Sequence, residues 1–494
     1  MSKVLTVGSP WRVIAVFSVP LLIGNVVQQL YHFADAIVVG RALGVESLAA
    51  VGATGSLLFL LIGFAWGMTN GFAIPTAQAF GAGDHAAVRR SVAAGTILTS
   101  AVTLLLVVGA PFLSEPVLRL LRTPEELVPE ATTFAVVSFL GAGATMAFNY
   151  LSAVIRAIGD SRTPLVFLTI ACLLNIVLVV LLVQVVGAGV GGAALATVVS
   201  QAVSVALCLR YVWKRVPVLH VRRTDWRVPR AELVEHLRLG LPMGFQSSII
   251  AIGILAVQVR LNDLGTEAVA AYTAAVRVDN LAVTLLASLG VAVSMFVAQN
   301  LGGGRPDRIR TGVVQATWMS VAGAVVIGVV LATCGGPIVS MFVGAGEDRV
   351  VAMAAQFLLL NGLLYSILGV LMVLRGALQG LGQTLVPTGV GVVELVMRVG
   401  AAAVLGASFG FSGVIWANPL AWIGAVVLLV PAYVRAHRRL AHAPIAPLAR
   451  VEATPPPVVL EGPSAGAQTV DTVVPQPRPA ADHEGCGDRE RVAP

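Results

Sequence analysis

The chain has 494 residues, of which 57% are hydrophobic and 12% are charged, and its formal net charge is +7. Soluble domains carry about 25% charged residues, and the mean hydropathy of +0.88 also excludes an ordinary soluble protein. The positive charge does not indicate a nucleic-acid partner, because the basic residues gather in the loops between apolar segments.

The apolar segments are long enough to cross a hydrocarbon core of about 30 Å as α-helices. The sequence therefore predicts an all-α integral membrane protein with twelve transmembrane helices. Its four cysteines have no metal-ligand spacing, so we expect neither a metal site of cysteines nor a disulfide framework. The expected spans are residues 12–39, 47–71, 91–113, 132–155, 164–184, 190–211, 239–263, 270–297, 312–334, 352–375, 385–407 and 411–434.

The loops between these spans alternate in charge. One set is basic and includes "GAGDHAAVRR", "RAIGDSRTP", "GGGRPDRIR" and the long segment 213–237, whereas the other set is short or acidic, as in "EELVPE". By the positive-inside rule the basic loops are cytoplasmic, which places both termini in the cytoplasm. We read no removable signal peptide at the N-terminus. Residues 441–494 are rich in Pro, Ala and Gly and are expected to form a disordered cytoplasmic tail.

The chain repeats itself at an offset of about 221 to 223 residues. "LGVESLAAV" at 43–51 matches "LGTEAVAAY" at 264–272, and "AQAFGAGDHAAVRR" at 77–90 matches "AQNLGGGRPDRIRT" at 298–311. Each repeat holds an even number of spans, so the two halves are parallel. We therefore expect two pseudo-symmetric six-helix lobes around a central cleft, at 1–212 and 238–440, joined by the basic linker 213–237.

The first span, in "NVVQQLYHFADAIVVGRALG" at 25–44, has one polar face. On a helix with about 100° per residue, Asn25, Gln28, Tyr31 and Asp35 lie within one arc of about 160°. A charge at bilayer depth costs at least about 2.5–3.5 kcal/mol, so it normally faces a cavity and marks an ion or proton path. Asn25 and Gln28 are therefore candidate substrate-binding residues. The structural alternative is that Asp35 only caps the outer end of the helix.

Several motifs in both halves resemble, in order, those of the multidrug and toxic compound extrusion (MATE) family. They are "LYHFADAIVVGRALG", "AQAFGAGDHAAVRRS", "RAIGDSRTP", "GGAALATVVSQ", "AAYTAAVRVDNLA" and "FVAQNLGGGR", and the resemblance covers about residues 11–435. The pair "AVRVD" and "QNLGGG" looks most like the DinF-like bacterial branch. The resemblance implies a bacterial inner-membrane protein that exports cationic, amphiphilic compounds in exchange for H⁺ or Na⁺.

The same resemblance implies a cation site in the N-terminal half. Asp35 matches the aspartate of that site, and Tyr31, Asn175 and Thr197 match other members of it. Many relatives have a second aspartate where this chain has Val179. A single carboxylate with hydroxyl and amide neighbours is a simpler proton acceptor than a carboxylate pair, which favours H⁺ over Na⁺, although Na⁺ at Asp35 stays open. No other cofactor is expected.

Two further charged pairs lie in predicted spans. Arg277 and Asp279 are in the eighth, and Glu394 and Arg398 in the eleventh. The i,i+4 spacing of Glu394 and Arg398 puts them within ion-pair reach on one helix face. The repeat offset places Arg398 at the position that corresponds to Asn175, so both would face the cleft. All four are candidate substrate-binding residues, and the alternative for each pair is a purely structural role.

The sequence thus predicts a monomeric antiporter of small organic cations or amphiphiles, not an enzyme. Protonation of Asp35 from outside would rearrange the first helix, which Pro20 and Gly24 allow to bend, and would release the bound compound. The main alternative is a flippase of lipids or lipid-linked glycans from the wider superfamily. A major-facilitator transporter fits the loops less well, and no HExxH or DDxxD motif supports an intramembrane enzyme. A scaffold would not explain the polar arc.

Overall fold

The computed structural model describes residues 5–120, 123–340 and 347–441, so all but the first residue of the predicted tail lies outside the described residues. The helices are α1 Pro10–Leu43, α2 Val45–Gly81, α3 His85–Leu120, α4 Val128–Leu140, α5 Ala142–Ala157, α6 Arg162–Val179 with a π-helical end η1 Val180–Val185, α7 Gly189–Arg215, the short 3-10 turns η2 Pro217–Leu219 and η3 Arg223–Trp226, α8 Arg230–Asp263, α9 Thr266–Gly302, α10 Pro306–Ser340, α11 Asp348–Gly380, α12 Leu385–Phe409, α13 Phe411–Val414 and α14 Ala417–Ala441.

The predicted all-α membrane architecture is confirmed. Ten described helical segments are long and apolar enough to cross a membrane, and the bent pair α4–α5 supplies an eleventh. The 37-residue helix α2 packs among them as the twelfth. The structure has no strand in its described ranges. Large apolar side chains such as Leu105, Phe112 and Val427 are exposed, which suits a surface that faces lipid.

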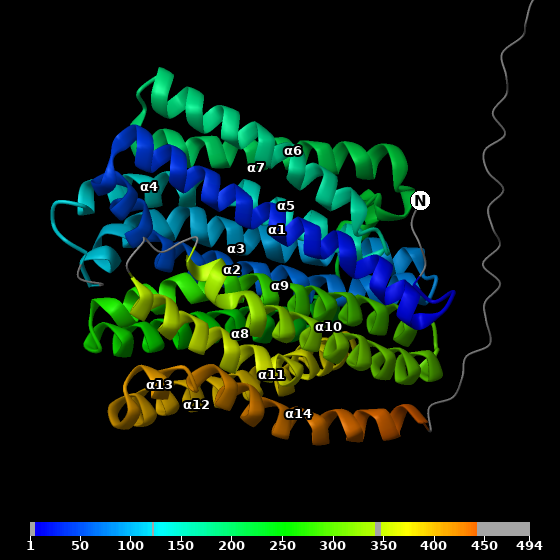
Figure 1. The fold of residues 1–494 in the computed structure, drawn as a ribbon. Coiled ribbons are helices and arrows are strands. Elements are labelled where there is room, and N and C mark those ends of the chain that lie inside the picture. Colours follow the sequence, from blue (N-terminus) through cyan, green and yellow to red (C-terminus); the bar gives the residue numbers. More distant parts are fainter. Residues whose placement is uncertain (1–4, 121–122, 341–346, 442–494) are drawn as a thin grey trace, which may run out of the picture. The chain divides into compact units, whose positions relative to one another are not determined.

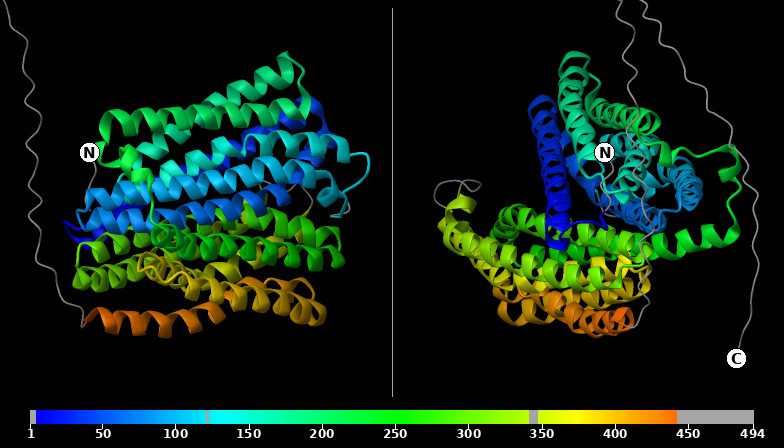
Figure 2. Two further views of the ribbon diagram at one scale, coloured as in Figure 1. Left: turned by 180° about the vertical axis from the view of Figure 1, so that it is seen from behind. Right: turned by 90° about the vertical axis from the view of Figure 1, so that its right-hand side faces the viewer.

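The helices of the two sequence repeats form two groups. Helices α1–α7 lie together in one group and α8–α14 in the other (Figure 1). Figure 2 shows the same two groups from behind and along the helices. Within each group the helices approach closely at small residues, as is common between membrane helices, where close packing replaces the hydrophobic effect. Gly328 of α10 and Gly362 of α11, for example, contact each other through their backbones.

The two halves contact each other near the basic end, by which we mean the end that carries loops 82–84, 158–161, 216–229 and 303–305. A Cβ atom on Gly81 of α2 would overlap the carbonyl oxygen of Gln299 of α9, and one on Gly302 would overlap that of Gln78. Toward the opposite end of α2, by contrast, Gly55 has no such neighbour within 4 Å. The halves are therefore in backbone contact at the basic end.

The N-terminal segment reinforces this contact. The backbone N–H of Leu5 donates to Oε1 of Gln299 at 2.8 Å, and Nδ2 of Asn300 donates to the Leu5 carbonyl at 3.3 Å. Arg308 of α10 donates from Nη1 to the carbonyl of Gly8 at 2.7 Å. Gln299 also donates to the carbonyl of Ala157 at the end of α5. Polar side chains of α9 and α10 thus hold the start of the chain and the end of α5.

We expect Gly302→Ala to weaken the contact between the two halves at the basic end. The added methyl group would overlap backbone atoms of α2, and overpacking of this kind typically costs about 1–3 kcal/mol. The measurement is thiol labelling of Ala77→Cys, a fully buried position beside the contact, with the native cysteines replaced by serine. Labelling should rise several-fold over that of the parent. Gly55→Ala is the matched control, since its Cβ meets open space. Equal labelling of the parent, the Gly302→Ala protein and the Gly55→Ala protein would contradict this role of the contact.

The linker between the halves is tied to α3. Asp225 accepts hydrogen bonds from the backbone N–H of Arg222 at 2.9 Å and from Nε of Arg89 at 3.1 Å, and Arg90 pairs with Glu232 at 2.9 Å. The Arg222 hydrogen bond, and then Arg89, hold the pKa of Asp225 below its ordinary value. Because the folded-state pKa is lowered, this stabilisation is present at neutral pH and is lost as the pH falls through the folded pKa.

Three details of the predicted spans change. The fourth span is not one straight helix, because α4 and α5 meet at Gly141 with a bend of 47°. A Cβ on Gly141 would overlap the side chain of Val198, so α7 packs directly against the break. The last span begins with the separate turn α13, and the predicted loop 156–164 begins inside α5, which continues to Ala157. By contrast, α1 continues unbroken through Pro20.

Candidate functional site

The four residues of the predicted cation site lie together between α1, α6 and α7. Asp35 and Tyr31 are one turn apart on α1, Asn175 is on α6 and Thr197 is on α7. The Thr197 hydroxyl interacts with both the carboxyl group of Asp35 and the phenol of Tyr31. Asn175 is fully buried and Tyr31 is 7% exposed, whereas Asp35 and Thr197 are half-buried. The sequence placed these residues on three separate spans, and folding brings them into contact.

The Asn175 amide completes the site. With its nitrogen turned toward the carboxylate, Nδ2 donates to Oδ1 of Asp35 at 2.8 Å, and its oxygen accepts the backbone N–H of Thr197 at 3.2 Å. This orientation satisfies both ends of the amide. Asp35 therefore accepts a hydrogen bond from α6 and interacts with the Thr197 hydroxyl of α7.

The position of the second acid found in many relatives is apolar here. Val179 is completely buried and packs with Val39, Val183, Ala193 and Ala196. A charged side chain introduced at this position would enter an apolar cluster, where an unpaired charge is costly. Asp35 is accordingly the sole carboxylate among the described members of this site.

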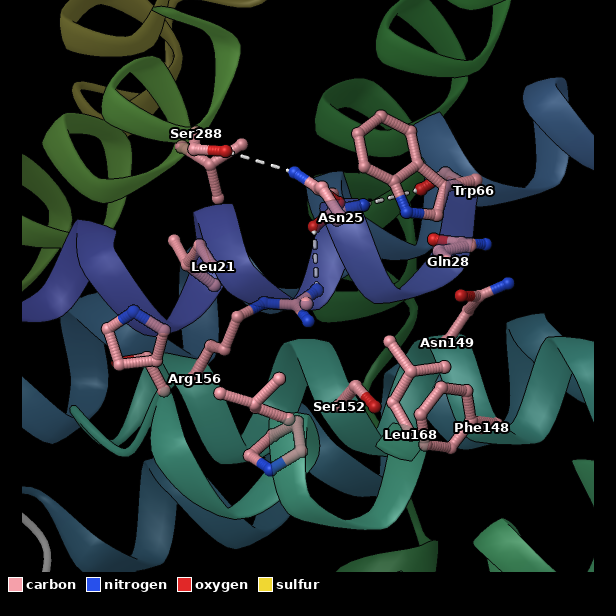
Figure 3. A pocket seen from close by; sticks show the side chains of 17 residues that line it. Leu21, Asn25, Gln28, Trp66, Phe148, Asn149, Ser152, Arg156, Leu168 and Ser288 are labelled. Atoms are coloured by element: carbon pink, nitrogen blue, oxygen red, sulfur yellow. Dashed lines mark hydrogen bonds between the residues drawn. The ribbon is translucent and has the colours of Figure 1, made fainter. Parts of the chain in front are cut away.

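A small cavity of about 80 Å³ lies farther along the polar face of α1, toward the basic end. Asn25 and Gln28 line it together with residues of α2, α5, α6 and α9 (Figure 3). Asn25 donates from Nδ2 to the Ser288 hydroxyl at 3.0 Å, which connects α1 to the other half of the molecule. Both predicted substrate-binding residues of the first span therefore border one cavity, and the polar face of α1 continues from that cavity to Asp35.

Arg156 also lines this cavity, and sequence reasoning missed it. Its motif "RAIGDSRTP" looked like a cytoplasmic loop, but Arg156 lies within α5 and extends toward α1, below Asn25 in the view of Figure 3. Its Nη2 donates to Oδ1 of Asn70 at 3.1 Å, while its Nε is buried and has no hydrogen-bond partner among the described residues. The long apolar run before it, "YLSAVIR", was the signal that the helix continues.

In the C-terminal half, Glu394 is the centre of a buried ionic network. It accepts hydrogen bonds from Nη2 of Arg375 at 2.6 Å and from Nη2 of Arg398 at 3.0 Å. All three side chains are less than 10% exposed. The predicted i,i+4 pair is thus present, but Arg375 of α11 is a partner that the sequence did not indicate. Gly253 of α8 leaves the space that the Arg398 guanidinium occupies.

The other charged pair of that half is separated. Asp279 is buried on α9 and accepts a hydrogen bond from the Tyr365 hydroxyl at 2.5 Å, within electrostatic range of Arg398. Arg277, two residues away, has an exposed side chain. Residues two apart on a helix point to different faces, so Asp279 joins the network of Glu394 while Arg277 does not.

These features define a polytopic membrane protein with an acidic site in one half, an ionic network in the other, and a polar cavity at the contact between them. The family profile MatE matches residues 20–181 and 242–422, one match in each half. The chain therefore belongs to the multidrug and toxic compound extrusion (MATE) family, whose members are membrane transporters. Its further placement in the DinF-like branch stays a prediction.

Individual relatives agree with this assignment. Probable multidrug resistance protein YpnP of Bacillus subtilis (strain 168) is 30% identical over 382 residues, which cover 77% of this chain and 84% of that protein. YoeA of the same organism, also a probable multidrug resistance protein, is 31% identical over 391 residues, covering 77% and 83%. A solved structure described as the outward-facing conformation of a multidrug resistance MATE family transporter has a TM-score of 0.82 at 23% identity, over 89% of this chain and 98% of that one.

Proposed function

We propose that this protein exports cationic or amphipathic organic compounds across the bacterial cytoplasmic membrane in exchange for protons. The observation that carries the proposal is the placement of Asp35 on the polar face of α1, where one carboxylate accepts a hydrogen bond from Asn175 and interacts with Thr197. The family membership and the names of YpnP and YoeA support export of organic compounds as the activity.

The groups that surround Asp35 favour H⁺ over Na⁺ as the coupling ion. A hard cation takes several oxygen ligands, but Asp35 is the only carboxylate among the described members of the site and the position of the second acid is occupied by the buried Val179. A proton needs only one acceptor oxygen. Neutralising Asp35 would remove its charge-assisted hydrogen bond with Asn175 and so change how α1 packs on α6. No cofactor other than the coupling ion is required.

The contact between the halves supports a cycle of alternating access. We infer that the basic end is cytoplasmic, as are both termini, and that this conformation is closed toward the cytoplasm. Protonation of Asp35 from outside would favour release of the bound compound, and opening at the basic end would return the proton to the cytoplasm. Such coupling requires that proton and compound favour different states. The protein would act as a monomer in the bilayer.

The lipid or lipid-linked glycan flippase is the weaker candidate, since YpnP and YoeA are both named for multidrug resistance. The test is uptake of a cationic fluorescent dye into everted membrane vesicles, which turn export into uptake. An acidic interior should drive uptake, and an equal Na⁺ gradient without a pH difference should not. Uptake driven by Na⁺ alone would contradict proton coupling, and movement of a lipid-linked sugar without dye transport would favour the flippase.

A further inference from the structure

The cavity beside α1 is lined by a cation, Arg156, that forms no ion pair with any described residue. Arg156 donates to a neutral amide, Asn70, and its Nε has no acceptor among the described residues. A guanidinium removed from water is costly unless an anion or several acceptors accompany it. Asn70 itself donates a hydrogen bond from Nδ2 to the carbonyl of Trp66, so it cannot move closer to Arg156 without losing that hydrogen bond.

Neighbouring carboxylates do not neutralise Arg156. Asp160, the nearest acid along the chain, accepts hydrogen bonds from the backbone of Arg162, from Thr163 and from the Tyr211 hydroxyl, which fixes it at the start of α6. Among the described residues that line the cavity, none is acidic. Within the part of the chain that the structure describes, the positive charge of Arg156 therefore has no carboxylate partner in the cavity.

The rest of the lining offers hydrogen-bond donors. The Ser152 hydroxyl, one turn before Arg156 on α5, is 3% exposed and has no partner among the described residues. Asn149, one turn earlier again, and Gln28 of α1 contribute amide groups. A carboxylate placed here would receive charge-assisted bonds from the guanidinium and a further bond from the hydroxyl, satisfying two groups that are otherwise unpaired.

We propose that this cavity is the subsite for a carboxylate group of the transported compound, so that the protein recognises zwitterionic compounds that carry both an amine and a carboxylate. This inference rests on the proposed function, because it supplies the second recognition point of the same substrate. Gln28 at the cavity and Asp35 are seven residues apart on α1, which is about 10 Å along a helix. An elongated organic zwitterion spans such a distance, with its amine toward Asp35 and its carboxylate at Arg156.

The test compares a fluorescent xanthene dye that carries a free carboxylate with its methyl ester, using the purified full-length protein. Arg156→Gln should weaken binding of the acid about tenfold or more, which is the usual effect of losing a hydrogen bond to a charged group, and should change ester binding less than about threefold. Ser152→Ala should weaken acid binding by a smaller factor. Arg156→Lys keeps the charge and should recover part of the loss. Arg162→Gln, which removes an exposed charge nearby, is the matched control.

The possible results of this binding experiment test the carboxylate subsite separately from the proposed export function. Ester binding by Arg156→Gln shows that the variant is folded. Equal weakening of both dyes would mean that Arg156 is structural, and an unchanged preference for the acid would mean that the cavity holds only water; either result overturns the subsite alone. Wild-type protein that binds neither dye would overturn the proposed function, and the subsite with it.

Discussion

Asp35→Asn is expected to abolish proton-driven dye uptake in everted vesicles, lowering it to the level of vesicles without the protein. The substitution preserves the size of the side chain but removes the only carboxylate among the described members of the site, so protonation no longer changes the charge beside Asn175 and Thr197. Dye binding should weaken but persist in the variant, because the substitution removes the charge that attracts the amine and leaves the rest of the polar face of α1 in place. Initial uptake rates at equal protein levels provide the measurement.

Two controls accompany this prediction. Asp307→Asn removes an exposed carboxylate of the basic end and should leave uptake unchanged. Asp35→Glu retains a titratable group in the same helix and should keep part of the activity. If Asp35→Asn transported at the wild-type rate and still responded to the pH gradient, the proposed mechanism would be wrong.

Glu394→Ala is expected to lower the stability of the protein far more than the loss of a surface ion pair does. It would leave Arg375 and Arg398 buried without their shared carboxylate, and breaking a buried ion pair typically costs about 3–5 kcal/mol. Thermal unfolding in detergent provides the measurement. Glu115→Ala is the matched control, since Glu115 and Arg119 form an i,i+4 pair at the surface, and an exposed pair of this kind contributes about 0.3–0.5 kcal/mol.

An apolar replacement of the network then separates structure from function. Buried ion pairs can often be replaced by apolar residues of similar volume without loss of stability, so the triple variant Glu394→Leu, Arg375→Met, Arg398→Met should regain stability that Glu394→Ala loses. If the triple variant is stable and still transports, the network is structural. If it is stable and inactive, the network contributes to transport. A Glu394→Ala protein as stable as the wild type would contradict the buried network itself.

Much of the fold could be predicted from the sequence, because apolar length and loop charge are local signals. The hydrophobic runs indicated the spans, and the repeat indicated the two halves. The break at Gly141 was missed, since "FLGAGAT" reads as an ordinary apolar run and the bend depends on how Val198 of α7 packs against it. Pro20 was expected to allow α1 to bend, but α1 continues through Pro20 without a break. A proline within a long membrane helix can be accommodated in this way because neighbouring groups satisfy the freed backbone.

The N-terminal site was predictable for a different reason. The helical periodicity of residues 25–35 put its acid on a polar face, and the family motifs supplied its partners on α6 and α7. Arg156 and Arg375 were not predictable in this way, because each lies where an apolar span approaches a loop and resembles an ordinary flanking charge. Their roles depend on which side of the helix faces the protein, and that is set by contacts with Asn70 and Glu394, which are distant in sequence.

The most direct test of the central claim, that compound and proton compete through Asp35, is the number of protons released when the compound binds. It is obtained by calorimetric titration of the purified full-length protein with a cationic dye in two buffers of different ionisation enthalpy. Reciprocal coupling requires that wild-type binding release protons and weaken as the pH is lowered. Asp35→Asn should bind without proton release and without this pH dependence. The same proton release from Asp35→Asn, or none from the wild type, would contradict the account.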